Sequence, residues 1–242
     1  RKRPLEAISM ASGKVDFSSG PVWRCILAQA VPLTLAQAVQ LLYNIVDRIY
    51  IGHIPEVGAT ALTGVGLFAA ILMFINAFAM LAGAGGAPLA AIALGKQDKN
   101  HAEKIMANSF SLLLVFAVIL TIAFYIGAPA LLTWFGASEA TLPYAVDYAR
   151  IYILGSIFVL IVMGMNPFIT TQGFAKISML TTVIGAVTNI VLDPILIFGF
   201  DMGVAGAAVA TVIGQWVAAI MASSCWKANT RFFQKLGLSL TL

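Results

Sequence analysis

Charged residues are scarce in this sequence: aspartate, glutamate, lysine and arginine together make up 10% of its 242 residues. A soluble globular domain carries about 25%. Hydrophobic residues make up 60% of the chain, which excludes an ordinary soluble domain. We attribute the net charge of +4 to the membrane topology argued below, and we expect no nucleic-acid partner.

Cysteine is almost absent as well. Cys25 and Cys225 are the only two in the chain, and both lie near predicted cytoplasmic ends of helices, where thiols stay reduced. The sequence contains no Cys-x-x-Cys pair and no Cys/His cluster. These absences argue against a structural metal site.

Long apolar runs are what the chain does contain. A helix needs about 20 apolar residues to cross a hydrocarbon layer of about 30 Å. Six runs are long enough: Val22–Val46, Ala61–Leu81, Phe110–Phe135, Tyr148–Ile169, Ile177–Phe200 and Val204–Trp226. They are continuously apolar rather than alternating, which favours helices over a β-barrel. The sequence therefore predicts an all-α polytopic membrane protein with six transmembrane helices.

Basic residues predict the orientation of these helices. With a cytoplasmic N-terminus, 12 of the 14 lysines and arginines face the cytoplasm, and only Arg48 and Arg150 face outward. This bias satisfies the positive-inside rule, so we expect both termini in the cytoplasm. Residues 1–20 are predicted to be a cytoplasmic tail rather than a cleavable signal peptide. Residues 21–227 are predicted to form the transmembrane lobe, and residues 228–242 a second cytoplasmic tail.

Proline and glycine mark the expected irregularities. Pro32 lies inside the first span and is predicted to bend it. The second apolar run continues past Leu81 through "GAGGAPLAAIAL", which is too long for one straight crossing. We therefore expect a helix to end before Pro88 and a second element to follow near the cytoplasmic surface. In the last span, Gly206, Ala210 and Gly214 recur every fourth residue, which favours close helix packing.

Polar side chains form a stripe on the first span. Gln37, Gln40, Asn44 and Asp47 are spaced by three, four and three residues, which places them on one face of a helix. Such a stripe on an apolar helix indicates a face that lines a cavity. By position alone Asp47 has another interpretation, because it is close enough to the outer interface to pair with Arg48 or to cap a helix.

Asp193 is the strongest candidate for a functional residue. Apolar residues flank it on both sides, Asn189 lies one turn before it, and Pro194 follows directly. Burial disfavours the charged form of a carboxylate that has no basic partner. Pro194 removes a backbone donor and can bend the helix, leaving carbonyls free for a cation. We therefore predict that Asp193 takes up a proton or a sodium ion, against the simpler role of a structural hydrogen-bond anchor.

Three segments resemble the multidrug and toxin extrusion (MATE) family of efflux transporters: "LYNIVDRIYIGH", "GAGGAPLAAIALGKQDKNHAEK" and "TNIVLDPILIFGFDMGVAGAAVATVIGQ". The resemblance is narrower to the bacterial and archaeal branch with an aspartate in the first helix, and it covers residues 21 to about 227. It implies a multi-pass protein in the inner (plasma) membrane of a prokaryotic cell, which exports cationic amphipathic molecules by alternating access, driven by protons or sodium. The coupling-ion site that it implies matches Asp47, Asp193, Asn189, Asn166 and Thr211.

Length is the departure from that family. Its members have twelve helices in two lobes, whereas this chain has the helices of one lobe, the amino-terminal one. The resemblance leaves three possibilities: a fragment, a half-transporter that forms a homodimer, or one half of a split pair. The expected partners are therefore membrane lipid, cationic amphipathic small molecules, and a second six-helix lobe or second copy.

We predict cation-coupled multidrug antiport, with no catalytic residue and no cofactor other than the coupling ion, H⁺ or Na⁺. A flippase for lipid-linked saccharides and a non-transporting partner subunit are the alternatives. An intramembrane aspartyl protease is disfavoured because Asp47 follows Val46 and Asp193 follows Leu192, so the expected Tyr-Asp and Gly-x-Gly-Asp contexts are missing.

Overall fold

The computed structural model describes the backbone of residues 21–229 and the side chains of residues 21–223. The predicted tail at residues 1–20, and most of the one at 228–242, lie outside these ranges. Seven helical elements follow one another: α2 (Val22–Gly52), α3 (Gly58–Gly95), α4 (Lys99–Trp134), α5 (Leu142–Thr171), α6 (Ala175–Pro194), η1 (Ile195–Gly199) and α7 (Gly203–Asn229). Six helices are long and apolar enough to cross a membrane, with η1 continuing α6. The predicted all-α polytopic fold is confirmed.

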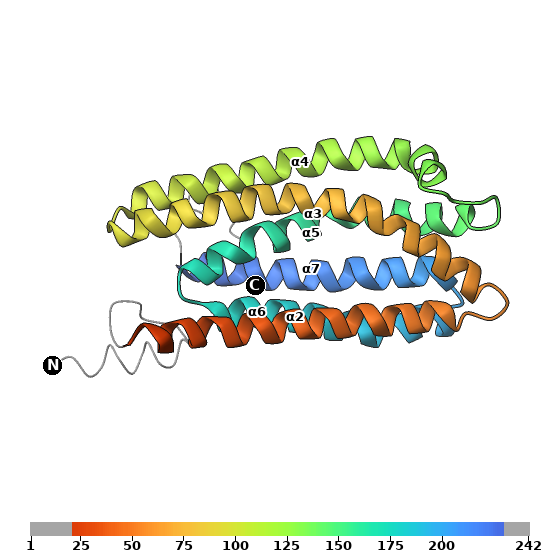
Figure 1. The fold of residues 1–242 in the computed structure, drawn as a ribbon, viewed down its shortest axis with the longest axis horizontal. Helices are drawn as coiled ribbons and strands as arrows, with labels where there is room; N and C mark the ends of the chain where they lie inside the picture. Colours follow the sequence, from red (N-terminus) through yellow and green to blue (C-terminus); the bar gives the residue numbers. More distant parts are fainter. Residues whose placement is uncertain (1–20, 230–242) are drawn as a thin grey trace.

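The helices run alongside one another as a bundle (Figure 1). Contacts follow the order α4–α3–α5–α7–α6–α2, and α4 also packs on α5. Helices α5 and α7 therefore form the centre of the bundle, while α2 and α4 lie at its edges. The α2–α3, α4–α5 and η1–α7 turns lie at one end, and the α3–α4 and α5–α6 turns lie at the other.

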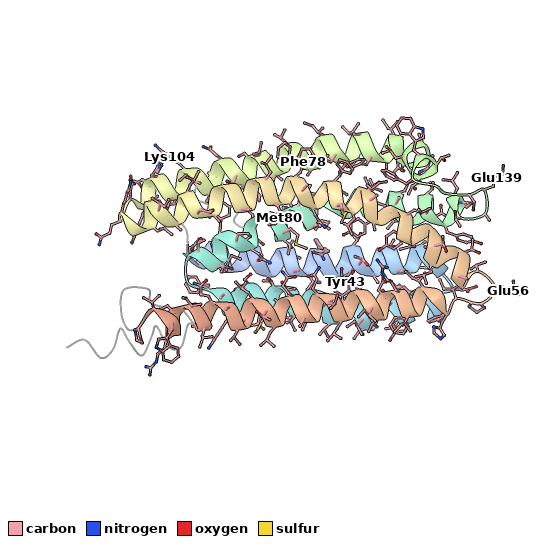
Figure 2. All side chains as sticks on the ribbon, in the orientation of Figure 1. Tyr43, Glu56, Phe78, Met80, Lys104 and Glu139 are labelled. Carbon is pink, nitrogen blue, oxygen red and sulfur yellow. The ribbon has the colours of Figure 1, made fainter. Side chains whose placement is uncertain are left out.

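The charged side chains separate between these two ends. Figure 2 shows Lys104 at one end and Glu56 and Glu139 at the other. In the part of the chain whose side chains are described, five basic residues lie near the Lys104 end: Arg24, Lys96, Lys99, Lys104 and Lys176. The opposite end has Arg48 and Arg150. The end with the α3–α4 and α5–α6 turns is therefore the inner end.

Local sequence signals explain where the helices end. The Asp98 side chain accepts a hydrogen bond from the His101 backbone N–H (3.0 Å) and caps α4. Gly136 and Gly173 follow α4 and α5 with φ of +100° and +92°, a left-handed conformation that glycine adopts without strain. At the C-terminal end of each of these two helices, a backbone N–H donates to the carbonyl oxygen five residues earlier. These hydrogen bonds run from Ala137 N to Leu132 O (2.9 Å) and from Phe174 N to Ile169 O (3.2 Å).

Glycine brings the helix backbones close together. A Cβ atom added to Gly214 of α7 would lie 2.7 Å from the Gly185 carbonyl oxygen of α6. One added to Gly206 would lie 2.8 Å from the Leu196 carbonyl carbon of η1. The small-residue stripe predicted in the last span thus packs against the preceding helical segment, and this close approach holds α6, η1 and α7 together.

The predicted break before Pro88 is wrong. Helix α3 continues through Gly95 for 38 residues, about 57 Å, so a single helix crosses the membrane and extends beyond it. Pro88 has no backbone N–H, so the helix lacks one hydrogen bond there, the one to the Ala84 carbonyl oxygen. Close packing of Gly83 against α5 supports the helix in the same region, since a Cβ on Gly83 would lie 2.6 Å from the Gly164 oxygen.

The two prolines predicted to bend helices behave differently. Pro32 is buried inside α2, which is unbroken from Val22 to Gly52. Pro194 ends α6, and a π-helical turn follows. In that turn the Phe200 N–H donates to Ile195 O (2.9 Å), one residue further back than in an α-helix. A π-turn is a common feature beside functional sites, and this one directly follows Asp193.

Candidate cation site

A hydrogen-bonded cluster joins α6 to α7 in the outer half of the bundle. The Asn189 amide nitrogen donates both to Asp193 Oδ1 (3.2 Å) and to Thr211 Oγ1 (3.1 Å). The Thr211 hydroxyl in turn donates to the Ala207 carbonyl oxygen (3.0 Å). Asp193 is 0% exposed, Asn189 2% and Thr211 4%. The structure thus brings together three of the five residues predicted for the coupling ion.

The direction of these hydrogen bonds determines which oxygen atoms of the cluster remain without a donor. Both partners of the Asn189 amide nitrogen are acceptors, so its oxygen must point the other way. Asn189 Oδ1, Asp193 Oδ2 and Asp47 Oδ1 are buried and have no hydrogen-bond partner. A buried acceptor without a donor is costly. All three unsatisfied atoms are acceptors, so a cation, a proton or a hydrogen-bond donor such as water would satisfy them.

Asp47 approaches this cluster from α2. It lies within the helix, five residues before Gly52, and is 7% exposed, while the neighbouring Arg48 is exposed. Arg48 still acts on it electrostatically. Asp47 also lies close enough to Asp193 for the two carboxylates to interact. Asp47 is therefore a buried carboxylate near this cluster, and it does not cap the helix, because α2 continues past it.

Three tyrosines surround the carboxylates, and the sequence analysis did not single them out. Tyr43 lies one turn before Asp47 and interacts electrostatically with both aspartates. Tyr148 and Tyr152 of α5 are buried. Each lies close enough to Asp47 to interact with it electrostatically, and Tyr148 lies near Thr211. Their rings stack at 6.0 Å between centroids. The available signal was the four-residue spacing from Tyr148 to Tyr152, which puts both hydroxyls on one helix face.

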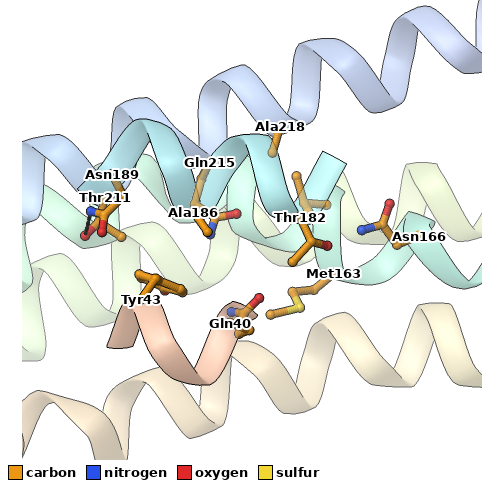
Figure 3. A pocket seen from close by; sticks show the side chains of 12 residues that line it. Gln40, Tyr43, Met163, Asn166, Thr182, Ala186, Asn189, Thr211, Gln215 and Ala218 are labelled. Carbon is orange, nitrogen blue, oxygen red and sulfur yellow. Dashed lines mark hydrogen bonds between the residues drawn. The ribbon is translucent and has the colours of Figure 1, made fainter. Parts of the chain in front are cut away.

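A narrow cavity leads away from this cluster between α2, α5, α6 and α7. Its volume is about 30 Å³, room for one or two water molecules. Figure 3 shows Asn189, Thr211 and Tyr43 at one end, and Thr182 and Asn166 at the other. The lining residues are Gln40, Tyr43, Val162, Met163, Asn166, Thr182, Gly185, Ala186, Asn189, Thr211, Gln215 and Ala218. A drug-sized molecule does not fit in this space.

The polar stripe predicted on α2 divides between several environments. Gln40 lines the cavity. Asn44 is half-buried, and its amide nitrogen donates to Gln40 O (2.7 Å) within the same helix. Gln37 is exposed. Gln37 and Asn44, both predicted to line a cavity, thus lie outside this one. The four side chains share one face of α2, but only part of that face is turned toward this cavity.

Asn166 is separated from the carboxylates. It lies at the far end of the cavity, where its Oδ1 accepts a hydrogen bond from Thr181 Oγ1 (3.4 Å). Its backbone oxygen accepts another from Thr170 Oγ1 (3.1 Å). The structure therefore places Asn166 near the inner end of α5 and not among the groups that touch Asp193.

The cluster presents oxygen ligands. Among the residues with described side chains, no group of three or more His, Cys, Asp or Glu side chains could hold a metal ion. Two carboxylates, an amide oxygen and a hydroxyl are hard oxygen ligands, the type that hard cations prefer.

Comparison with known proteins places these features in a family. The model of the MatE family matches residues 32–195. "Multidrug export protein MepA" of Staphylococcus aureus (strain MSSA476) is 29% identical over 212 residues, which cover 84% of this chain and 45% of that protein. The chain thus spans about half the length of its curated relatives.

Solved structures agree with this assignment. "MATE in the bent conformation" and "MATE in the straight conformation" each match with a TM-score of 0.80 and 31% identity, covering 87% of this chain and 47% of theirs. The matched family model extends from Pro32 through Asp193, and so includes both carboxylates. From the six-helix fold and these matches, we conclude that the chain belongs to the MatE family.

Proposed function

We propose that this chain supplies one lobe of a multidrug exporter and carries its coupling-ion site at Asp193 and Asp47. The observation that carries the proposal is the set of three unsatisfied buried oxygens on Asp47, Asn189 and Asp193. A proton or a sodium ion bound there would flow inward while a cationic amphipathic molecule leaves. The export activity of MepA, a relative by sequence, supports the substrate class.

The site joins two elements that need not move together. Asp47 is on α2 at the edge of the bundle, whereas Asp193 is on α6, which packs against α7. Two buried carboxylates repel one another when both are charged. A bound cation removes that repulsion, so α2 packs tightly against α6, and release of the cation loosens the contact.

Pro32 gives α2 a position at which the helix can bend when the cation binds or leaves. A proline inside a helix lacks one backbone hydrogen bond, so bending there costs less than elsewhere. Cation release would thus favour a bent α2 and cation binding a straight one. Related structures bear the names bent and straight, which supports two such states in this chain.

The flippase alternative fits the described spans less well. Recognition of a lipid-linked saccharide phosphate favours basic side chains. In the part of the chain whose side chains are described, the lysines and arginines lie toward the helix ends and none lies in the middle of a span. A non-transporting subunit would not require buried oxygens left without partners. Cation-coupled export therefore accounts best for both features.

The coupling-ion site is tested by chemical labelling of the purified chain. Dicyclohexylcarbodiimide reacts with protonated carboxyl groups in apolar surroundings. We expect Asp193 to be labelled, and the labelling to fall as the pH rises or, for a sodium site, as sodium is added. Asp193→Asn should abolish this label. Asp201→Asn is the matched control, because Asp201 is exposed in the turn before α7.

Two results would overturn the proposal. One is labelling of Asp193 that responds neither to pH nor to sodium. The other is retention of drug resistance by Asp193→Asn in cells that express the chain together with any second lobe it requires.

A further inference from the structure

The cavity extends inward from the cation site, and two buried oxygens in its lining have no hydrogen-bond partner within the protein, whereas Asn166, Thr182 and Thr211 are hydrogen-bonded. Gln215 Oε1 is buried and has no hydrogen-bond partner. The same is true of Asn189 Oδ1, at the end of the cavity next to the cation site. Gln40 lines the same space from α2. A volume of about 30 Å³ holds one or two waters when each has two to four polar partners. These amides provide such partners.

Depth along the helices shows where the cavity leads. Asp193 lies 18 residues after Ala175, the inner end of α6, which is about 27 Å. Thr182 lies only seven residues from the same end, about 10 Å. Asn166 lies five residues before the inner end of α5 at Thr171, about 8 Å. The polar lining thus runs from the outer half of the lobe almost to its cytoplasmic ends.

Polar groups continue for another turn beyond the cavity. Thr170 donates to the Asn166 carbonyl oxygen (3.1 Å), and the Gln29 amide nitrogen donates to the Thr170 carbonyl oxygen (3.3 Å). These groups come from α2 and α5 and are half-buried. Polar side chains at membrane depth are costly and usually face the interior of a bundle or a water-filled cavity.

We propose that this cavity is the inner part of a cation path confined to the lobe, which connects the Asp47–Asp193 site to the cytoplasm through Gln215, Gln40, Thr182 and Asn166. It takes a small monovalent cation, sodium or hydronium, solvated by water and by amide and hydroxyl oxygens. The ion then leaves inward without entering the space between lobes. The proposal rests on the proposed cation site for its outer end.

The test measures access of silver ion, a small cation that reacts with thiols. Cys25 and Cys225 are first replaced by serine. Ala186→Cys puts a thiol on the cavity wall, and Val187→Cys, at nearly the same depth on α6, puts one on the lipid-facing side, where Val187 is 52% exposed. Silver nitrate is added to either face of membrane vesicles in nitrate buffer, and the remaining thiol is counted with a maleimide after denaturation.

We expect the Ala186→Cys thiol to be blocked from the cytoplasmic face at least 100-fold faster than the Val187→Cys thiol. Thr182→Cys is nearly isosteric and closer to the inner end, so it should react at least as fast. Gln215→Leu or Gln40→Leu should slow the reaction at least tenfold. Gln37→Leu is the matched control, since Gln37 is on the same helix but outside the cavity, and it should leave the rate unchanged.

Equal rates for Ala186→Cys and Val187→Cys, or reaction from the outer face only, would overturn the proposal. Sodium nitrate that slows the silver reaction identifies sodium as the ion in the path, and no effect of sodium identifies hydronium. The outcome is independent of drug export. Should carbodiimide labelling of Asp193 prove insensitive to pH and sodium while silver still enters from inside, the coupling site fails and the inner path remains.

Discussion

The Thr211 hydroxyl orients the cation site without carrying charge. It accepts from Asn189 and donates to Ala207 O, and so holds the Asn189 amide with its nitrogen toward Asp193. That nitrogen stabilises the charged carboxylate. A shape-conserving change at Thr211 therefore acts on Asp193 through Asn189.

Thr211→Val should make carbodiimide labelling of Asp193 at least about tenfold faster, at an alkaline pH where the unmodified chain reacts slowly. A hydrogen bond to a charged group contributes about 1.5–3 kcal/mol, and about 1.4 kcal/mol corresponds to a factor of ten. The control is Thr188→Val, because Thr188 donates only to Ile184 O in its own helix (2.8 Å). The same labelling rate in both variants would show that Thr211 does not orient the site.

At the scale of the helices, glycines decide how closely neighbouring elements approach. Gly83 of α3 meets the Gly164 backbone of α5, whereas Gly85, two residues further along α3, has nothing within 4 Å of an added Cβ. Both residues are glycines of α3, but a backbone lies opposite Gly83 and open space lies opposite Gly85.

Gly83→Ala should destabilise the lobe by about 1–3 kcal/mol, because the new methyl group meets backbone atoms that cannot rotate away. Gly85→Ala should be neutral or stabilising by up to about 1 kcal/mol, because alanine favours a helix. Thermal unfolding in detergent compares the pair. Equal melting temperatures would contradict the packing of α3 against α5.

The helical pattern was predictable where it depends on the local sequence, and not where it depends on contacts between helices. Hydropathy is a property of each run of residues, so it predicted six spans, and charge predicted their orientation. The break before Pro88 was wrong, because glycine and proline weaken an isolated helix, but Gly83 is held by a backbone on α5 that the local sequence does not reveal.

The candidate site was predictable only in part, again because the local sequence does not reveal contacts between helices. Asp193, Asn189 and Thr211 occur in a family-like segment, and the structure brings them together. The roles of Gln37 and Asn166 depend on which way each helix faces and how deep it lies. A period of 3.6 residues in one helix does not give the rotation of that helix against its neighbours.

At the scale of the whole molecule, α2 exposes polar groups that lipid does not satisfy. Thr34 and Gln37 are exposed, and Gln37 lies 15 residues, about 22 Å, along α2 from Val22. Polar side chains at that depth normally face protein or water. We therefore expect this face of α2 to meet water or protein, such as a second lobe or a second copy.

We expect the purified chain to have a detergent-corrected mass of about twice 25.6 kDa by light scattering, as a twofold dimer. In a background without other cysteines, Gln37→Cys should cross-link across the dimer on mild oxidation. Val115→Cys on α4 is the control, since Val115 is 53% exposed at the opposite edge of the bundle. A mass of 25.6 kDa would contradict self-association and favour a different six-helix partner.

The length of α3 and α4 has a practical consequence. They contain 38 and 36 residues, about 57 and 54 Å, while the hydrocarbon layer is about 30 Å thick. Their shared turn at residues 96–98 carries exposed charge, so this rigid hairpin emerges from the lipid on the cytoplasmic side. It is a ready epitope for an antibody fragment. Such a fragment would give this 25.6 kDa chain the mass outside the micelle that image alignment in electron cryomicroscopy requires.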